Sequence, residues 1–188
     1  MATIINASTS AGLVQTADSS GDLNIQSGGS TKIAVTSAGV AVTGLAKASL
    51  PTGSVLQVVN ATYNTSTSTT STSGVTTGLT ASITPTSATS KILVLFNVNG
   101  LSFTSAANGN VYTDLRRNGS VILSAATGSQ FGTAYVPVYS VGSNYLDSPA
   151  TTSSTTYAVF FSIGGGANPA YVQMNGEKSA ITLLEIAA

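Results

Sequence analysis

The sequence contains no histidine, no cysteine and no tryptophan among its 188 residues. A Ser-His-Asp triad, a Cys-His pair and the usual zinc sites each need a residue type that is missing here. Disulfide bonds are excluded for the same reason. Only carboxylate chemistry is left, so we predict a protein that is not an enzyme and that uses no metal and no cofactor.

Charge is also scarce. Charged residues make up 6% of the chain and the net charge is zero, whereas soluble domains typically carry about 25% charged residues. The basic residues are scattered, and only Arg116 and Arg117 are adjacent. A groove that neutralises several phosphates is therefore not expected, and we predict no nucleic-acid partner. Because 42% of the residues are hydrophobic, low charge does not indicate disorder here.

Long apolar runs are absent. The longest strongly apolar run is residues 92–96, far below the ~20 residues that a membrane span needs. The opening MATIINASTSAG lacks the basic and then apolar pattern of a secretion signal. We expect neither a membrane span nor export by such a signal.

Residues 12–45 carry short β-type bursts separated by clusters of Gly, Ser and Asp. The bursts are LVQT at 13–16, LNIQ at 23–26, KIAV at 32–35 and VAVT at 40–43. Each offers only two or three apolar side chains, too few to offset the cost of ordering the backbone of one chain. We therefore predict a short shaft or collar whose core is shared, with the segment intertwined in a homotrimer.

The segment LAKASLPTG at 45–53 separates these bursts from longer apolar stretches. The predicted organisation is an anchoring β-repeat segment at 1–45, a linker at 46–53 and a β-sandwich domain at 54–188. A Ser/Thr tract at 65–73 suits an exposed edge or long loop, and disorder is the alternative.

The second region alternates strand-like runs with Gly- and Pro-rich turns, which is typical of an all-β fold with an antiparallel, jelly-roll-like β-sandwich and little helix. Asn118-Gly119 predicts a two-residue hairpin turn. The nearly continuous apolar run KILVLFNVNG at 91–100 indicates a strand with two buried faces, which needs a second sheet or a subunit interface. The other predicted strands are at 55–64, 79–85, 111–125 around the hairpin, 134–141, 155–163, 170–175 and 180–186. The segment GSNYLDSP at 142–149 is predicted to be a turn because it contains Gly, Ser, Asn and Pro.

Two sets of side chains are candidates for function. The candidates for the core or the trimer interface are Ile92, Val94, Phe96, Leu115 and Arg117. The candidates for contact with a host surface glycan are Arg116 and Tyr145, because guanidinium groups bind phosphate and Tyr rings stack on sugars. For the two arginines we favour an ion pair at a subunit interface for one and solvation for the other.

A polysaccharide-cleaving site would need two carboxylates facing each other across about 5 to 10 Å. Asp114 and Asp147 are the pair to consider. We favour Asp114 as a partner of an arginine on a neighbouring strand and Asp147 as a turn former before Ser-Pro.

The opening ATIINASTSAGLVQTADSSGDLNIQSGGSTKIAVTSAGVAVTG resembles the N-terminal region of tail-fibre and other virion structural proteins of aquatic tailed bacteriophages. The later stretches GSVLQVV, SITPTSATSKILV, LRRNG, YLDSPATTSSTTY and ITLLEIAA are similar to the β-domain of those proteins. The resemblance implies a trimeric β-sandwich protein on the surface of the virion, made in the host cytoplasm.

In that reading the N-terminal segment attaches to other virion proteins of the tail or capsid, and the β-domain faces outward. Only residues 1–45 precede the globular part in this sequence, which is short for a tail fibre. A capsid decoration, spike or head-fibre protein, or an adhesin that binds host glycans, therefore remains an alternative.

Overall fold

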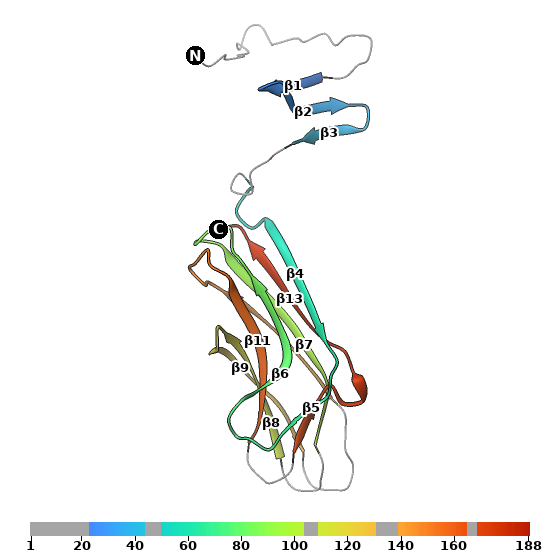
Figure 1. Ribbon diagram of the computed structural model, residues 1–188, viewed down its shortest axis with the longest axis vertical. Helices are drawn as coiled ribbons and strands as arrows, with labels where there is room; N and C mark the ends of the chain where they lie inside the picture. The colour runs from blue at the N-terminus through green and yellow to red at the C-terminus, as the bar shows by residue number, and fades with distance from the viewer. Residues whose placement is uncertain (1–22, 44–49, 104–108, 131–138, 165–168) are drawn as a thin grey trace. The chain divides into compact units, whose positions relative to one another are not determined.

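The structure is a computed structural model that describes residues 23–43, 50–103, 109–130, 139–164 and 169–188 (Figure 1). The chain divides into two compact units, Met1–Ala46 and Lys47–Ala188, here called unit 1 and unit 2. The described residues contain strands and one 3-10 turn, η2 (Met174–Gly176), and no α-helix. The predicted all-β fold class is confirmed.

Unit 1 contains a three-stranded antiparallel sheet of order β1-β2-β3. Its strands are β1 (Leu23–Ser27), β2 (Ser30–Thr36) and β3 (Gly39–Val42). They coincide with the predicted bursts at 23–26, 32–35 and 40–43, because turns at Gly28-Gly29 and before Gly39 separate them. The burst predicted at 13–16 lies outside the described residues.

Unit 2 is a sandwich of two antiparallel sheets, β4-β13-β7-β10 and β6-β11-β8-β9 (Figure 1). Numbered from one to eight along the chain, these strands have the orders 1-8-3-6 and 2-7-4-5, which is the jelly-roll arrangement. The strands are β4 (Val55–Tyr63), β6 (Val75–Ile83), β7 (Lys91–Phe103), β8 (Gly109–Arg117), β9 (Ser120–Gln130), β10 (Tyr139–Asp147), β11 (Thr155–Ile163) and β13 (Ser179–Ile186).

Two short strands extend the first sheet. The strand β12 (Ala170–Val172) pairs with the last residues of β7 and with β5 (Thr67–Thr69). The Ser/Thr tract at 65–73 therefore contains an edge strand. An exposed edge is one of the two ordered structures, edge or long loop, that the sequence predicts for this tract.

The core of unit 2 lies between the two sheets, because alternation along each strand points every second side chain toward the other sheet. Its largest fully buried apolar side chains are Tyr157, Phe161, Leu79, Ile92, Leu115, Ile181 and Leu183. They come from both sheets, so the sandwich closes around a core of its own.

Two glycines fix local geometry. Asn118 and Gly119 both have positive φ, 48° and 87°, which confirms the predicted hairpin turn between β8 and β9. Gly78 has φ +83°, lies opposite a register irregularity between β6 and β11, and faces the ring of Tyr63 so closely that a Cβ would overlap it. A β-bulge with a glycine is needed there.

The prediction was wrong at one strand. The stretch 142–149 was interpreted as a turn because it contains Gly, Ser, Asn and Pro, but β10 continues to Asp147 and pairs with β7 along this stretch. Alternation explains the outcome, because Ser143 and Tyr145 face the core side while Gly142 and Asn144 are exposed. Most of the strand predicted at 134–141 lies outside the described residues.

Candidate interaction surfaces

The sheet of unit 1 has one apolar face, made of two complete cross-strand rows. Leu23 pairs with Val35 and Val35 with Val40, while Ile25 pairs with Ile33 and Ile33 with Val42. On the opposite face the row is Asn24, Ala34 and Ala41. We call the six side chains Leu23, Ile25, Ile33, Val35, Val40 and Val42 the unit 1 face.

Most of the unit 1 face is in contact with solvent in a single chain. Five of its six side chains are 37 to 68% exposed, with Val40 the most exposed, and Ile33 is intermediate. A strand with alternate apolar residues normally buries that side. Within the described part of the chain, the unit 1 face therefore has no layer packed over it.

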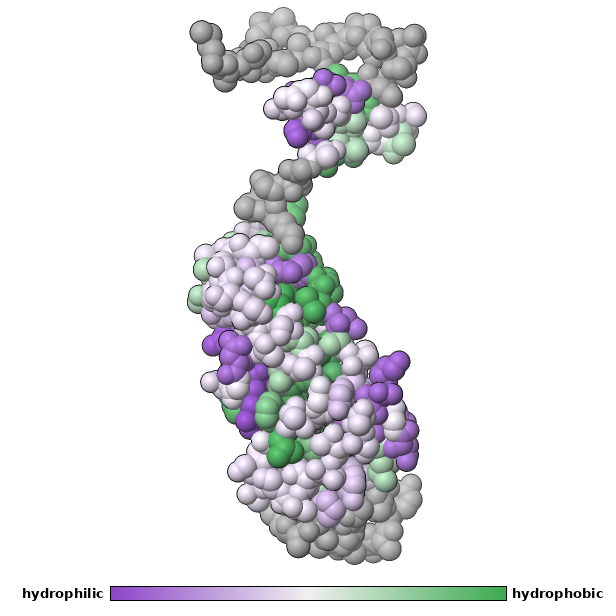
Figure 2. Space-filling view, in the orientation of Figure 1, coloured by the Kyte–Doolittle hydropathy of each residue, from purple (hydrophilic) through white to green (hydrophobic). Residues whose placement is uncertain are grey.

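A second apolar surface lies on the first sheet of unit 2, on the side away from the core. Register places Val58 beside Leu184, Leu184 beside Leu93, and Leu93 beside Leu146, so one apolar side chain from each of four strands forms a row. We call this row the unit 2 ridge. Val58 is 58% exposed and Leu146 50%. Figure 2 shows hydrophobic residues gathered over β4 and the end of β13.

Beside the unit 2 ridge the same face is hollowed. The neighbouring rows contain Leu95 next to Thr182 and Asn144, and then Ala180, Asn97 and Gly142. Because Gly142 has no side chain and Ala180 a small one, a shallow depression of about 350 Å³ lies over β13, β7 and β10.

The outer face of the second sheet is different in character. It presents hydroxyls of β6, the charged pair Asp114 and Arg116, and Phe160 under the guanidinium at 4.1 Å. Asp114 and Arg116 are 3.6 Å apart at their closest charged atoms. This face therefore combines a charged pair and hydroxyls with the exposed side chains of Tyr112 and Val121.

The side chains predicted for the core or a trimer interface lie inside one chain. Ile92, Val94, Phe96 and Leu115 are all buried in the core of unit 2. Arg117 stands at the end of β8 and donates from Nη1 to both oxygens of Asp147, at 2.8 and 2.9 Å.

Asp147 joins three strands, and the structure corrects its interpretation as a turn former. It ends β10, is 5% exposed, and also accepts a hydrogen bond of 2.6 Å from the hydroxyl of Tyr157 on β11. Burial, together with this bond to a carboxylate, raises the pKa of Tyr157 above its ordinary value. The carboxylate, the guanidinium of Arg117 and the phenol thus tie the two sheets together.

The two predicted glycan contacts are not brought together. Arg116 lies on the outer face of the second sheet, whereas Tyr145 on β10 packs against the core from the first sheet. Asp114 and Asp147 are separated in the same way, one on the outer face and one between the sheets. Neither pair has the geometry of a shared site.

Glu185 is a buried carboxylate that is held by neutral hydrogen-bond donors. Its oxygens accept hydrogen bonds from the backbone and hydroxyl of Thr86, at 2.6 and 2.7 Å, and from the amide of Gln57 at 2.6 Å. Burial acts to raise the pKa of Glu185, but these hydrogen bonds outweigh it and hold the pKa below its usual value. The group fixes the loop between β6 and β7 to the sheet.

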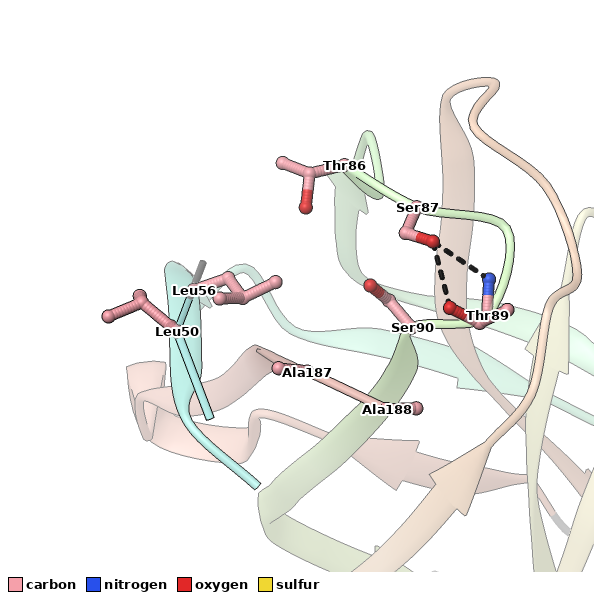
Figure 3. Close-up of a pocket in the computed structure, with 8 residues that line it drawn as sticks. All are labelled: Leu50, Leu56, Thr86, Ser87, Thr89, Ser90, Ala187 and Ala188. Atoms are coloured by element: carbon pink, nitrogen blue, oxygen red, sulfur yellow. Dashed lines mark hydrogen bonds between the residues drawn. The ribbon is translucent and has the colours of Figure 1, made fainter. Parts of the chain in front are cut away.

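A small pocket of about 250 Å³ lies next to this loop (Figure 3). Thr86, Ser87, Thr89 and Ser90 line one side, and Leu50, Leu56 and the C-terminal alanines line the other. The hydroxyls of Ser87 and Thr89 bond each other at 2.8 Å. No charged side chain lines the pocket, so it offers little to fix a ligand.

Within the described ranges, no group of three or more acidic residues is placed to hold a metal ion. The same residues include no helix that is long and apolar enough to cross a membrane.

Sequence reasoning missed the unit 2 ridge, although a signal for it was present. Both β7 and β13 carry apolar residues at consecutive positions, as in ILVLF and ITLLEI. Such strands are apolar on both faces, and the described residues of one chain leave the outer face partly exposed. The run at 91–100 was interpreted in this way, but β4, β10 and β13 were not.

The sequence matches no protein-family model and no curated protein. Solved structures of infectious bursal disease virus are similar to 70% of this chain. They are the Gx strain (13% identity, TM-score 0.38), the Gt strain (14%, 0.35) and T=1 particles derived from the virus (14%, 0.32). The match spans 32, 38 and 36% of those viral chains, so this chain corresponds to about a third of their length.

Proposed function

We propose that this protein is a non-enzymatic structural component of a bacteriophage particle. In the proposal it forms a homotrimeric surface fibre, attached to other virion proteins by its N-terminal segment, with the jelly roll displayed outward. The function is mechanical and architectural: it positions a stable domain on the particle.

The observation that carries the proposal is the unit 1 face. Burying a Val, Leu or Ile side chain stabilises a structure by about 1.5 to 3 kcal/mol, and five of the six side chains in this face are more than a third exposed in a single chain. A single sheet has to bury its apolar face against another layer. Three copies that turn these faces toward one axis form a closed apolar core, which is how a fibre shaft is built.

The assignment to a virus particle is supported by two independent features. The stretches quoted above resemble virion proteins of tailed bacteriophages, and they come from both units. The strand order of unit 2 is that of the jelly roll, an architecture used by viral capsid and lectin domains. The second feature is an analogy of fold and supports the class rather than the site.

The engagement of three described carboxylates with other side chains supports a non-enzymatic role. The chain has no His and no Cys. Of its carboxylates, Asp114 and Asp147 are each engaged with an arginine and Glu185 with neutral donors. None of these three is left to act as an acid or base opposite another.

The test is the solution mass of the full chain by light scattering, followed by detection of the protein in purified particles. We expect about three times the chain mass of 18.7 kDa. A monomer at micromolar concentration would overturn the shared shaft. Immunogold labelling then separates a tail fibre from a capsid decoration protein, since the two place the label at different parts of the particle.

A further inference from the structure

We infer that the outer face of the β4-β13-β7-β10 sheet, which carries the unit 2 ridge, is covered by a second copy of this chain. The inference rests on the proposed homo-oligomer and deepens it, because it names the surface by which the jelly rolls meet. The interface would thus lie on the side of this sheet that faces away from its own core.

The first argument is the composition of this face. An antiparallel sheet with one side in water alternates apolar and polar residues. Here Leu93 and Leu184 are apolar on the outer side, although their neighbours Val94 and Leu183 already supply the core. The outer positions therefore carry apolar residues that the fold of a single chain does not require.

The second argument is charge. Across the rows that pair on this face the only charged residue is Lys91, at the end where it pairs with Ile186. Two copies of a surface whose one charge lies at its end repel each other little when they meet. A nucleic acid or an acidic partner would find no attraction here. The outer face of the second sheet, with Asp114 and Arg116, lacks this property.

The third argument is shape. The unit 2 ridge projects beside the depression formed where Gly142 and Ala180 replace larger side chains. Ridge and depression are different patches of one face, so the ridge of one copy can enter the depression of the next. Such head-to-tail contacts are heterologous and close into a ring when the rotation allows it.

The fourth argument is area. Four strands about 4.8 Å apart and about 8 residues long cover roughly 500 Å², whereas a stable interface buries about 800 Å² per partner. The face is therefore too small to hold two copies by itself. It suffices when unit 1 already holds the chains together, because tethering raises the effective concentration of the second contact.

The test uses the natural absence of cysteine. In the full chain, Val58→Cys places one thiol on this face and Val121→Cys places one on the outer face of the second sheet. The two valines are 58% and 49% exposed in a single chain, so an uncovered chain would react at both with similar rates. We expect maleimide to label the thiol of V58C about tenfold more slowly than that of V121C, because access controls the rate.

The outcomes separate this inference from the proposed function when the mass of each variant is measured alongside. A trimer with slow labelling only at position 58 supports the inference. A trimer in which both thiols react at equal rates overturns the inference but agrees with the shared shaft. A monomer with equal rates overturns both the inference and the shared shaft. Slow labelling in a monomer would mean that a segment of the same chain covers the face, which also overturns the inference.

Discussion

Unit 1 and unit 2 are built from the same kind of short antiparallel strand, but they place their apolar side chains differently. In unit 2 the inner faces of two sheets meet, and residues such as Leu79 and Leu183 have no exposed surface. In unit 1 a single sheet leaves Val40 and Val42 at least half exposed. Alternation produces an apolar face in both units, and among the described residues only unit 2 has a second sheet to cover that face.

The difference indicates that the two units are stabilised in different ways. The stability of unit 2 comes from contacts within one chain, so it should fold whether or not copies associate. In the proposed homotrimer the unit 1 face is covered by other copies, so the order of unit 1 should depend on protein concentration. The outer face of the first sheet of unit 2 lies between these cases, since its strands are held by the core on one side and carry the unit 2 ridge on the other.

The largest effect should come from a charge on the unit 1 face. Val35 lies in the central strand, between Leu23 and Val40. Val35→Asp should cost about 3 kcal/mol per copy in association, because it removes apolar burial and brings like charges together. Light scattering should show the mass fall to that of one chain, while unit 2 should still melt as a folded domain. Ala34→Asp, on the opposite face of the same strand, is the control and should leave the mass unaltered.

A change in the core should lower the stability of the fold and leave association intact. Leu183→Ala should lower the free energy of unfolding of unit 2 by about 3 kcal/mol, since it leaves a cavity between the sheets. Thermal melting should show the loss, and the mass of the assembly at low temperature should stay the same. Leu184→Ala, the next residue on the outer face, should cost the fold less and weaken association more. If both changes had the same effect, the contrast between the two faces of this strand would be wrong.

Much of this architecture follows from sequence because it is local. Alternating apolar residues and Gly-rich turns located most described strands, and Asn118-Gly119 defined its hairpin. Sequence-distant pairs could not be found in this way. Arg117 meets Asp147 across 30 positions, and Gln57 meets Glu185 across 128. These partners are adjacent only because of the jelly-roll strand order, which no local pattern states.

The strand that was misjudged illustrates the same limit. Residues 142–145 have the composition of a turn, and their pairing with β7 alone makes them a strand. Conversely, the run at 91–100 correctly indicated two apolar faces, but the sequence did not indicate that the described residues would leave the second face partly exposed.

A smaller effect is expected from Glu185, which tests whether unit 2 is stabilised within one chain. Glu185→Gln should cost about 2 kcal/mol at pH 7, because its new amide would face the amide donor of Gln57. The pKa of Glu185 is lower in the folded state than its ordinary 4.5. Its contribution is therefore present above pH 4.5 and is lost as the pH falls through the folded-state pKa.

Chemical denaturation of wild type and E185Q between pH 3 and 7 measures this contribution. The wild type should lose stability toward acid, and the variant should lose less. Glu177→Gln is the control, because Glu177 is an exposed carboxylate just after η2. If both variants and the wild type lost the same stability at low pH, the pH dependence would come from groups other than Glu185.

The smallest effect is expected from the hydroxyl of Tyr157, which also acts within one chain. Tyr157→Phe should cost about 1.5 kcal/mol at pH 7, because it removes a hydrogen bond to a charged carboxylate that keeps Arg117 as its partner. Burial, and then the bond to Asp147, raises the folded-state pKa of Tyr157 above its ordinary 10.0. This contribution is complete below pH 10 and declines as the pH rises beyond it, since the unfolded chain loses the proton first.

Unfolding measured between pH 8 and 11 should therefore show that the stability of the wild type declines. The decline should be smaller in Y157F and should be retained in Tyr112→Phe, because Tyr112 is 41% exposed. Because this bond links β10 to β11 inside one chain, the decline should be independent of protein concentration, unlike the association through the unit 1 face.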